Sequence, residues 1–206
     1  AGAGDCAHVS PVSVISQDDS PNGIAFSKSG EKMFIVGDSG NDVNEYKLTG
    51  AYCIGSATFV DSFSVKSEES SARGIAFSKS GEKMFIVGGS GDDVNEYKLT
   101  AAWDVSSASF VDSFSVNSQD TDPGGIAFSK SGEKMFIVGQ AGDDVNEYKL
   151  TAAWDVSSAS FVDSFSVNSE ESQPRGIAFS KSGEKMFILG SSGDGVDEYK
   201  LSAAWD

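Results

Sequence analysis

Acidic side chains in short glycine turns are the residues of this sequence best suited to chemistry, and they recur at a fixed spacing. Gly91-Asp92-Asp93 and Gly142-Asp143-Asp144 are two copies of the turn, 51 residues apart. Carboxylate and carbonyl oxygens are the ligands that Ca2+ prefers, so the turns are candidate calcium sites. Calcium is the one cofactor suggested, and no motif requires a cofactor. The candidate ligands are Asp42, Asp92, Asp93, Asp143, Asp144 and Asp194.

The same carboxylates also have a plainer explanation. Like charges keep a protein surface soluble and keep molecules apart. No turn has the full spacing of an EF-hand loop, and Gly195 replaces the second Asp in the last copy. Four equal calcium sites are therefore not expected.

One aromatic residue recurs at a matched position in each copy, and these are Tyr52, Trp103, Trp154 and Trp205. Each ring either folds under its own copy and covers the core, or stands as a platform for a ligand. Aromatic platforms suit sugar rings or another protein, because they combine a large apolar face with an N–H or O–H group.

Cys6 and Cys53 are the only cysteines, and two cysteines can form one disulfide. Two free thiols or a link between subunits are the alternatives. The opening residues contain no signal peptide and begin with Ala, which favours a secreted chain whose leader has been removed. We therefore expect an extracellular or secreted protein.

The usual catalytic motifs are missing. His8 is the only histidine and lies outside the repeats. The serines show no nucleophile-elbow pattern, and zinc sites, phosphate loops and dinucleotide motifs are absent. We predict that the protein is not an enzyme.

The elements that must position these residues come from one unit written four times. Gly-Ile-Ala-Phe-Ser-Lys-Ser-Gly-Glu-Lys-Met-Phe-Ile begins at Gly23 and returns at Gly74, Gly125 and Gly176. A fixed period of this length is typical of solenoids and propellers. We predict an N-terminal extension over residues 1–8 and a single domain of four near-identical repeats over residues 9–206.

Each repeat reads as four short strands joined by Gly, Asp and Ser turns, which is typical of a propeller blade. In the third copy we expect strands over residues 108–116, 125–129, 134–139 and 145–150, and no helix. The predicted fold is an all-β, four-bladed β-propeller. Residues 12–15 lie 51 positions before residues 63–66, so we expect the N-terminal strand to close the last blade. Exchange between two chains into a larger ring is the alternative.

The repeated motif resembles the blades of bacterial NHL, YVTN and lactonase-like propellers, with Lys28-Ser29 where such repeats commonly carry Pro-Asp. The resemblance covers about residues 9–206 and implies the fold. Lactonase-like enzymes of this kind take acidic metal ligands and polar catalytic groups from different blades. Because the blades here are nearly identical, no such site can be matched residue by residue.

Charge is expected to separate between the two faces of the propeller. The formal net charge is −16, which argues against nucleic acid and acidic membrane surfaces as partners. No apolar run approaches the length of a membrane span. The acidic loops should share one face, together with Arg73 and Arg175, whereas the Lys-Ser-Gly-Glu-Lys turns should lie on the other face.

We therefore predict a non-enzymatic, structural self-assembly module that stacks face to face into filaments, with itself as partner. The alternative is a multivalent adhesin or lectin that binds a surface glycan or protein. A lactonase-like hydrolase is the third hypothesis.

Overall fold

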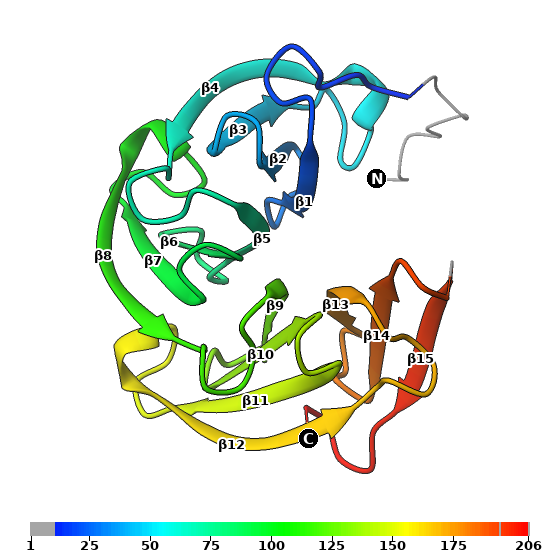
Figure 1. Cartoon of the computed structure of the whole chain (residues 1–206). Helices are drawn as coiled ribbons and strands as arrows, with labels where there is room; N and C mark the ends of the chain where they lie inside the picture. The colour runs from blue at the N-terminus through cyan, green and yellow to red at the C-terminus, as the bar shows by residue number, and fades with distance from the viewer. Residues whose placement is uncertain (1–10, 194, 206) are drawn as a thin grey trace.

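Four antiparallel sheets follow one another around a common axis and form a four-bladed β-propeller (Figure 1). The structure is a computed structural model and describes residues 11–193 and 195–205. Each sheet uses consecutive strands of the chain. The all-β fold and the four blades predicted from the sequence period are confirmed.

Strands that hold the same place in the four blades have nearly the same sequence. The innermost strands carry Gly-Ile-Ala-Phe and are β1 (Pro21–Phe26), β5 (Ala72–Phe77), β9 (Pro123–Phe128) and β13 (Pro174–Phe179). The second strands are β2 (Lys32–Gly37), β6 (Lys83–Gly88), β10 (Lys134–Gly139) and β14 (Lys185–Gly190). The third strands are β3 (Asp42–Lys47), β7 (Asp93–Leu99), β11 (Asp144–Leu150) and β15 (Val196–Lys200). The outer strands are β4 (Thr58–Ser64), β8 (Ala108–Ser115) and β12 (Ala159–Ser166).

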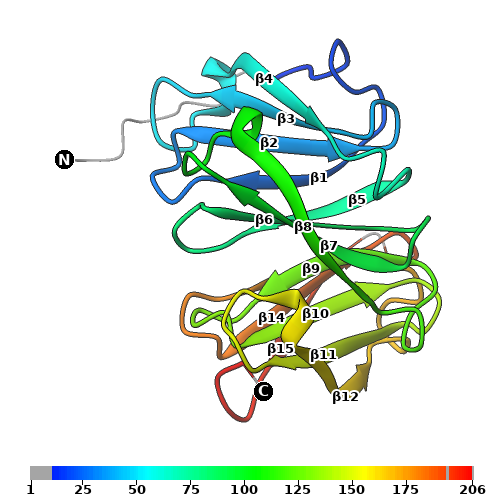
Figure 2. The same ribbon diagram turned by 90° about the vertical axis from the view of Figure 1, so that its left-hand side faces the viewer.

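The outer strands are strongly twisted, and Figure 2 shows β8 crossing the rim of the molecule obliquely. This follows from the right-handed twist that accumulates across a sheet.

The hydrophobic core lies between neighbouring blades. Phe34 and Val36 of β2 pack with Met84 and Ile86 of β6, and the same contacts recur between the later blades. Strands β2, β6 and β10 are covered on both faces, which explains why their sequence is apolar without alternation.

Our expectation of no helix is wrong in one respect, because each of the first three blades contains a one-turn 3-10 helix before its outer strand. These helices are η1 (Ile54–Ser56), η2 (Val105–Ser107) and η3 (Val156–Ser158). In η2 the Asp104 carboxylate accepts the backbone N–H of Ser106 at 3.1 Å. A side chain that satisfies a free N–H stabilises such a turn. None of the helices in the described residues is long and apolar enough to cross a membrane.

The ring has an opening between the first and last blades (Figure 1). The last sheet contains three strands, β13, β14 and β15, and described residues 11–15 form no strand. Our expectation that the N-terminal strand closes the last blade is therefore not met. The physical reason is that Val14 packs on the first blade, beside Met33 and Ile35, across the opening from β15.

Candidate functional site

Glycine at the centre of the molecule lets the inner strands approach closely. A Cβ on Gly74 would lie 2.7 Å from the carbonyl oxygen of Gly124, and one on Gly125 would lie 2.8 Å from the carbonyl oxygen of Arg175. Real Cβ atoms do not come so near. The repeated glycine therefore sets how closely neighbouring inner strands pack around the central axis.

The residue before each of these repeated glycines lies at one end of the central axis. It is Asn in β1, Arg in β5, Gly in β9 and Arg in β13. Together with two residues of the turns that follow the second strands, these residues line a hollow of about 240 Å3. The lining residues are Asn22, Asp38, Arg73, Gly124, Gln140 and Arg175.

All six lining residues come from two positions at which the blades differ. The first position holds Asn22, Arg73, Gly124 and Arg175, and the second holds Asp38, Gly89, Gln140 and Ser191. By contrast, the Lys-Ser-Gly-Glu-Lys turn on the opposite face is identical in every blade. The repeats are therefore unlike one another around this hollow.

The two arginines of the hollow have different surroundings. Arg73 donates from Nη1 to the carboxylate of Asp122 in the next blade. A Cβ on Gly89 would lie 2.7 Å from Nη2 of Arg73, so Gly89 leaves room for the guanidinium. Arg175 is exposed and forms no ion pair with the residues that the structure describes. Its positive charge is therefore available to an anion.

Asp38 brings a carboxylate to the same hollow. Its Oδ1 accepts the hydroxyl of Ser71 at 3.1 Å, and Ser71 lies two residues before Arg73. The hollow thus combines two cations, one carboxylate and the amides of Asn22 and Gln140. Such a set can bind an oxyanion and can accept a proton from water.

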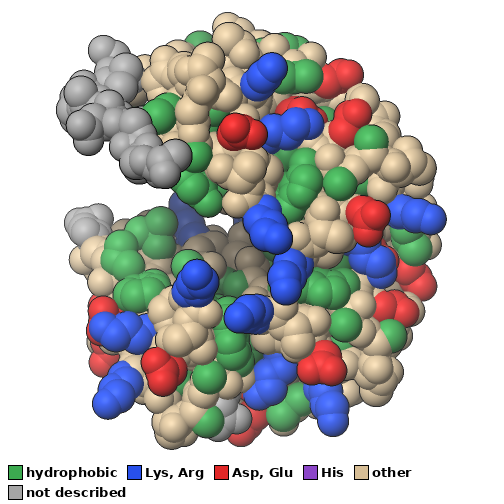
Figure 3. Space-filling view, turned by 180° about the vertical axis from the view of Figure 1, so that it is seen from behind, with side chains coloured by type: hydrophobic (Ala, Val, Ile, Leu, Met, Phe, Trp, Pro, Cys, Tyr) green, Lys and Arg blue, Asp and Glu red, His purple; other side chains and the backbone are tan. Residues whose placement is uncertain are grey.

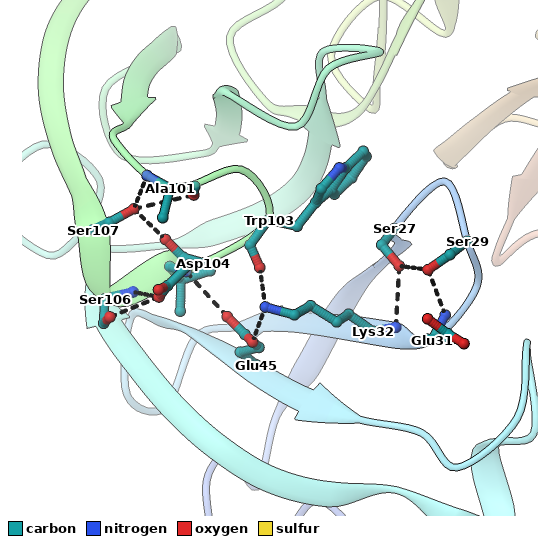
Figure 4. A network of polar contacts seen from close by, with 11 residues as sticks. Ser27, Ser29, Glu31, Lys32, Glu45, Ala101, Trp103, Asp104, Ser106 and Ser107 are labelled. Atoms are coloured by element: carbon teal, nitrogen blue, oxygen red, sulfur yellow. Dashed lines mark hydrogen bonds and ion pairs between the residues drawn. The ribbon is translucent and has the colours of Figure 1, made fainter.

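A second polar network joins neighbouring blades (Figure 4). Lys32 Nζ contacts Glu45 Oε1 at 2.7 Å and donates to the carbonyl oxygen of Trp103 in the next blade at 2.7 Å. Glu45 Oε2 accepts the backbone N–H of Val105 at 3.1 Å. Lys83 and Glu96 repeat the arrangement, so this network holds blades together.

The tryptophans proposed as platforms lie half-buried over the glycine of their own blade's turn. A Cβ on Gly81 would collide with the Trp103 ring, whose centroid is 5.1 Å from that of Phe77. Trp154 and Trp205 pack in the same way on Phe128 and Phe179. Tyr52 is exposed, with its ring centroid 5.3 Å from that of Phe26. Ligand binding by these four rings stays a prediction.

The acidic turns place the candidate calcium ligands at the start of the third strands. Asp42, Asp93 and Asp144 are the first residues of β3, β7 and β11. Asp92 and Asp143 have positive φ, and Asp92 Oδ2 accepts the amide of Asn117 at 2.6 Å. The described residues bring together no group of three acidic, His or Cys side chains suited to a metal. Asp194 lies outside the described residues, and calcium binding stays a prediction.

Cys53 is disulfide-bonded. Cys6, the only other cysteine of the sequence, lies outside the described residues, as does His8.

Buried carboxylates anchor the loops around the hollow. Glu171 is buried, which by itself would raise its pKa, but the Ser192 hydroxyl and the backbone N–H groups of Gln173, Gly193 and Ser192 lower the pKa to about 2. Asp120 holds the matching position in the third blade, and burial raises its pKa above the usual value. The pKa values of these two equivalent carboxyls are thus shifted in opposite directions.

Comparison with known proteins supports the fold. No protein-family model and no curated protein sequence matches the chain. A putative 6-phosphogluconolactonase from Bacteroides uniformis superposes with a TM-score of 0.62 at 12% identity, over 87% of this chain and 50% of the other. The periplasmic gluconolactonase of Pseudomonas aeruginosa superposes at 0.57 with 16% identity, over 87% and 49%. Hydrazine synthase from Kuenenia stuttgartiensis superposes at 0.60 with 16% identity, over 97% and 49%.

The chain spans about half the length of the solved structures it matches. At these identities the matches establish the propeller fold and confirm the resemblance to lactonase-like propellers. They also correct our prediction of a non-enzymatic assembly module, because several of the similar propellers are named as lactonases.

The central hollow was not predicted from the sequence, because the near-identity of the blades argued against a distinct site. The signal was nevertheless present in the differences between the copies. Arg73 and Arg175 share one position with Asn22 and Gly124, and comparison of the four copies at that position identifies the site.

Proposed function

We propose that the protein is a lactonase-like hydrolase that opens the ring ester of a sugar-acid lactone in the central hollow. One observation carries the proposal: Arg73, Arg175, Asn22 and Asp38 line a hollow on the axis, at positions where the blades differ. The names of the similar propellers supply the substrate class.

The proposed reaction begins with addition of water to the lactone carbonyl carbon, with the water proton passing to the Asp38 carboxylate. Arg175 donates hydrogen bonds to the oxygen that becomes negatively charged. The ring C–O bond then breaks, and the leaving oxygen takes the proton to give a hydroxy acid. Arg175 can bind the new carboxylate through two parallel hydrogen bonds.

Hydrolysis of gluconolactone, followed by acid release at constant pH and corrected for the spontaneous rate, tests the proposal. Loss of one oxyanion donor lowers kcat by about 10^2-fold to 10^3-fold, and we expect that loss for Arg175→Gln. Asp38→Asn should lower the rate by about 10^2-fold or more. Lys181→Gln, in the invariant turn on the other face, is the matched control and should leave the rate unchanged. A wild-type rate equal to the spontaneous rate would refute the assignment.

An extracellular location remains our proposal. The disulfide of Cys53 supports it, because disulfides persist in oxidising compartments. Antibody detection of the protein in the culture medium and in cell fractions tests the proposal, and recovery only from the cytoplasmic fraction would contradict it.

A further inference from the structure

The surfaces on either side of the opening carry exposed apolar residues whose counterparts at the interfaces between blades are buried. We propose that a second copy of this chain closes the ring, so that the last blade of each copy packs on the first blade of the other. The product is an eight-bladed propeller with two-fold symmetry. The proposal concerns an interaction surface and does not depend on lactonase activity.

The last blade presents an apolar face with nothing packed on it. Val36, Val87 and Val138 are 0% exposed, whereas Leu189 at the same position is 53% exposed. On the neighbouring strand, Val43 and Val94 are 0% exposed, whereas the matching Val196 is 64% exposed. In the first three blades, this face is covered by the next blade.

The first blade presents the complementary surface. Ile75 and Ile126 are 7% exposed, but Ile24 at the same position is 56% exposed. Val105 and Val156 are 0% exposed, whereas Ile54, which replaces them, is 43% exposed. In the later blades these positions lie against the preceding blade.

The polar contacts of the interface are also half-formed. Lys185 Nζ lies 2.6 Å from Glu198 Oε1, which repeats the pair of Lys32 and Glu45, but both side chains are about half exposed. Tyr52 and Ile54 hold the chain positions of Trp103 and Val105, and in the single chain the Ile54 N–H donates to the Tyr52 carbonyl oxygen at 3.0 Å. In the closed ring, Lys185 of the other copy would donate to the Tyr52 carbonyl oxygen, and the Ile54 N–H would exchange its bond to Tyr52 for one to Glu198.

A second copy fits the opening better than the chain's own first blade does. Figure 3 shows that the described side chains leave the opening unfilled. The three internal interfaces share the same Lys-to-Trp carbonyl bond at 2.7 Å, so they repeat one geometry. To bring the last blade against the first blade of the same chain, the angle between blades would have to change at these interfaces. The chain spans about half of the propellers it matches, so two copies contain about one full ring. Contact between unlike faces closes into a ring when the rotation permits.

Sedimentation velocity of the full chain over a range of concentrations tests the proposal. We expect a species of twice the 21.5 kDa chain mass. Val196→Asp should weaken self-association by at least about 100-fold, since it places a charge in an apolar interface. Val196 is exposed in the single chain, so the variant should fold, and circular dichroism checks this. Val111→Asp, at an equally apolar and half-exposed site on the outer strand β8, is the matched control and should remain a dimer.

Three results would overturn the proposal. The first is a monomer at the highest concentration reached, and the second is a dimer that Val196→Asp leaves intact. The third is a series of larger polymers without a closed dimer. Because the measurement is of mass, failure of the lactonase proposal would not affect it.

Discussion

At the residue scale, Glu171 and Asp120 show how the same place in two blades can have opposite electrostatic behaviour. Glu171 accepts hydrogen bonds from the hydroxyl and backbone N–H of Ser192 and from the N–H groups of Gln173 and Gly193. These bonds stabilise the ionised form and lower the pKa to about 2. Asp120 is dominated by burial, so its pKa rises.

Glu171→Gln should therefore change the acid sensitivity of the protein. A carboxyl whose folded pKa is depressed contributes stability that is full above its usual value of 4.5 and is lost as the pH falls towards 2. We expect the free energy of unfolding to depend less steeply on pH across this window in the variant. Urea unfolding at several pH values measures this. Glu170→Gln is the control, and an equal flattening in both variants would contradict the assignment to Glu171.

The Lys–Glu pairs of the second blade and the last blade differ in burial, and so in energy. Glu96 is buried and bonded to Lys83 and to the next blade, so Glu96→Gln should lower the free energy of unfolding by about 3 kcal/mol or more. Glu198 is about half exposed, and Glu198→Gln should cost at most about 1 kcal/mol. Urea unfolding should be measured at the lowest concentration that fluorescence allows, so that no second copy covers Glu198. Equal losses in the two variants would show that burial does not set the energy.

At the element scale, the close approach of the inner strands depends on glycine. A Cβ on Gly74 would lie 2.7 Å from both the Gly124 carbonyl oxygen and Val87 Cγ1. Gly74→Ala should lower the free energy of unfolding by about 1–3 kcal/mol, as expected for overpacking. Gly91→Ala is the control because its nearest atom lies 3.7 Å away. A Gly74→Ala protein as stable as this control would mean that the strands move apart without penalty.

The strands themselves were predictable because their signals are local. The apolar run of β10 and the alternation of β11 identify two strands without reference to any other part of the chain, although the polar Asn146 of β11 is buried and not solvent-facing as its alternation suggests. The 3-10 turns were missed because η2 depends on a side-chain bond from Asp104, which strand patterns do not reveal. The central hollow was missed because its lining residues, such as Arg73 and Arg175, come from different blades, and their meeting depends on the ring.

At the scale of the whole molecule, the net charge of −16 is a source of self-repulsion. Added NaCl screens such charges, so the melting temperature at pH 7 should rise between low and high salt. At pH 3 most exposed carboxyls are protonated, and the rise should largely disappear. Differential scanning calorimetry at both pH values checks this. A rise of equal size at pH 3 would indicate a general salt effect that does not depend on carboxylate repulsion.

The repeated contact between blades also has a consequence for how such a protein changes over generations. Lys32 with Trp103 and Lys83 with Trp154 make the same bond across successive interfaces, 51 residues apart. In repeat proteins each unit contacts only its neighbours. Unequal recombination between two copies in the gene would remove or add one blade, and the newly joined blades would meet through contacts already in use. The number of blades is thus a heritable quantity that can change in a single step without redesign of the interface.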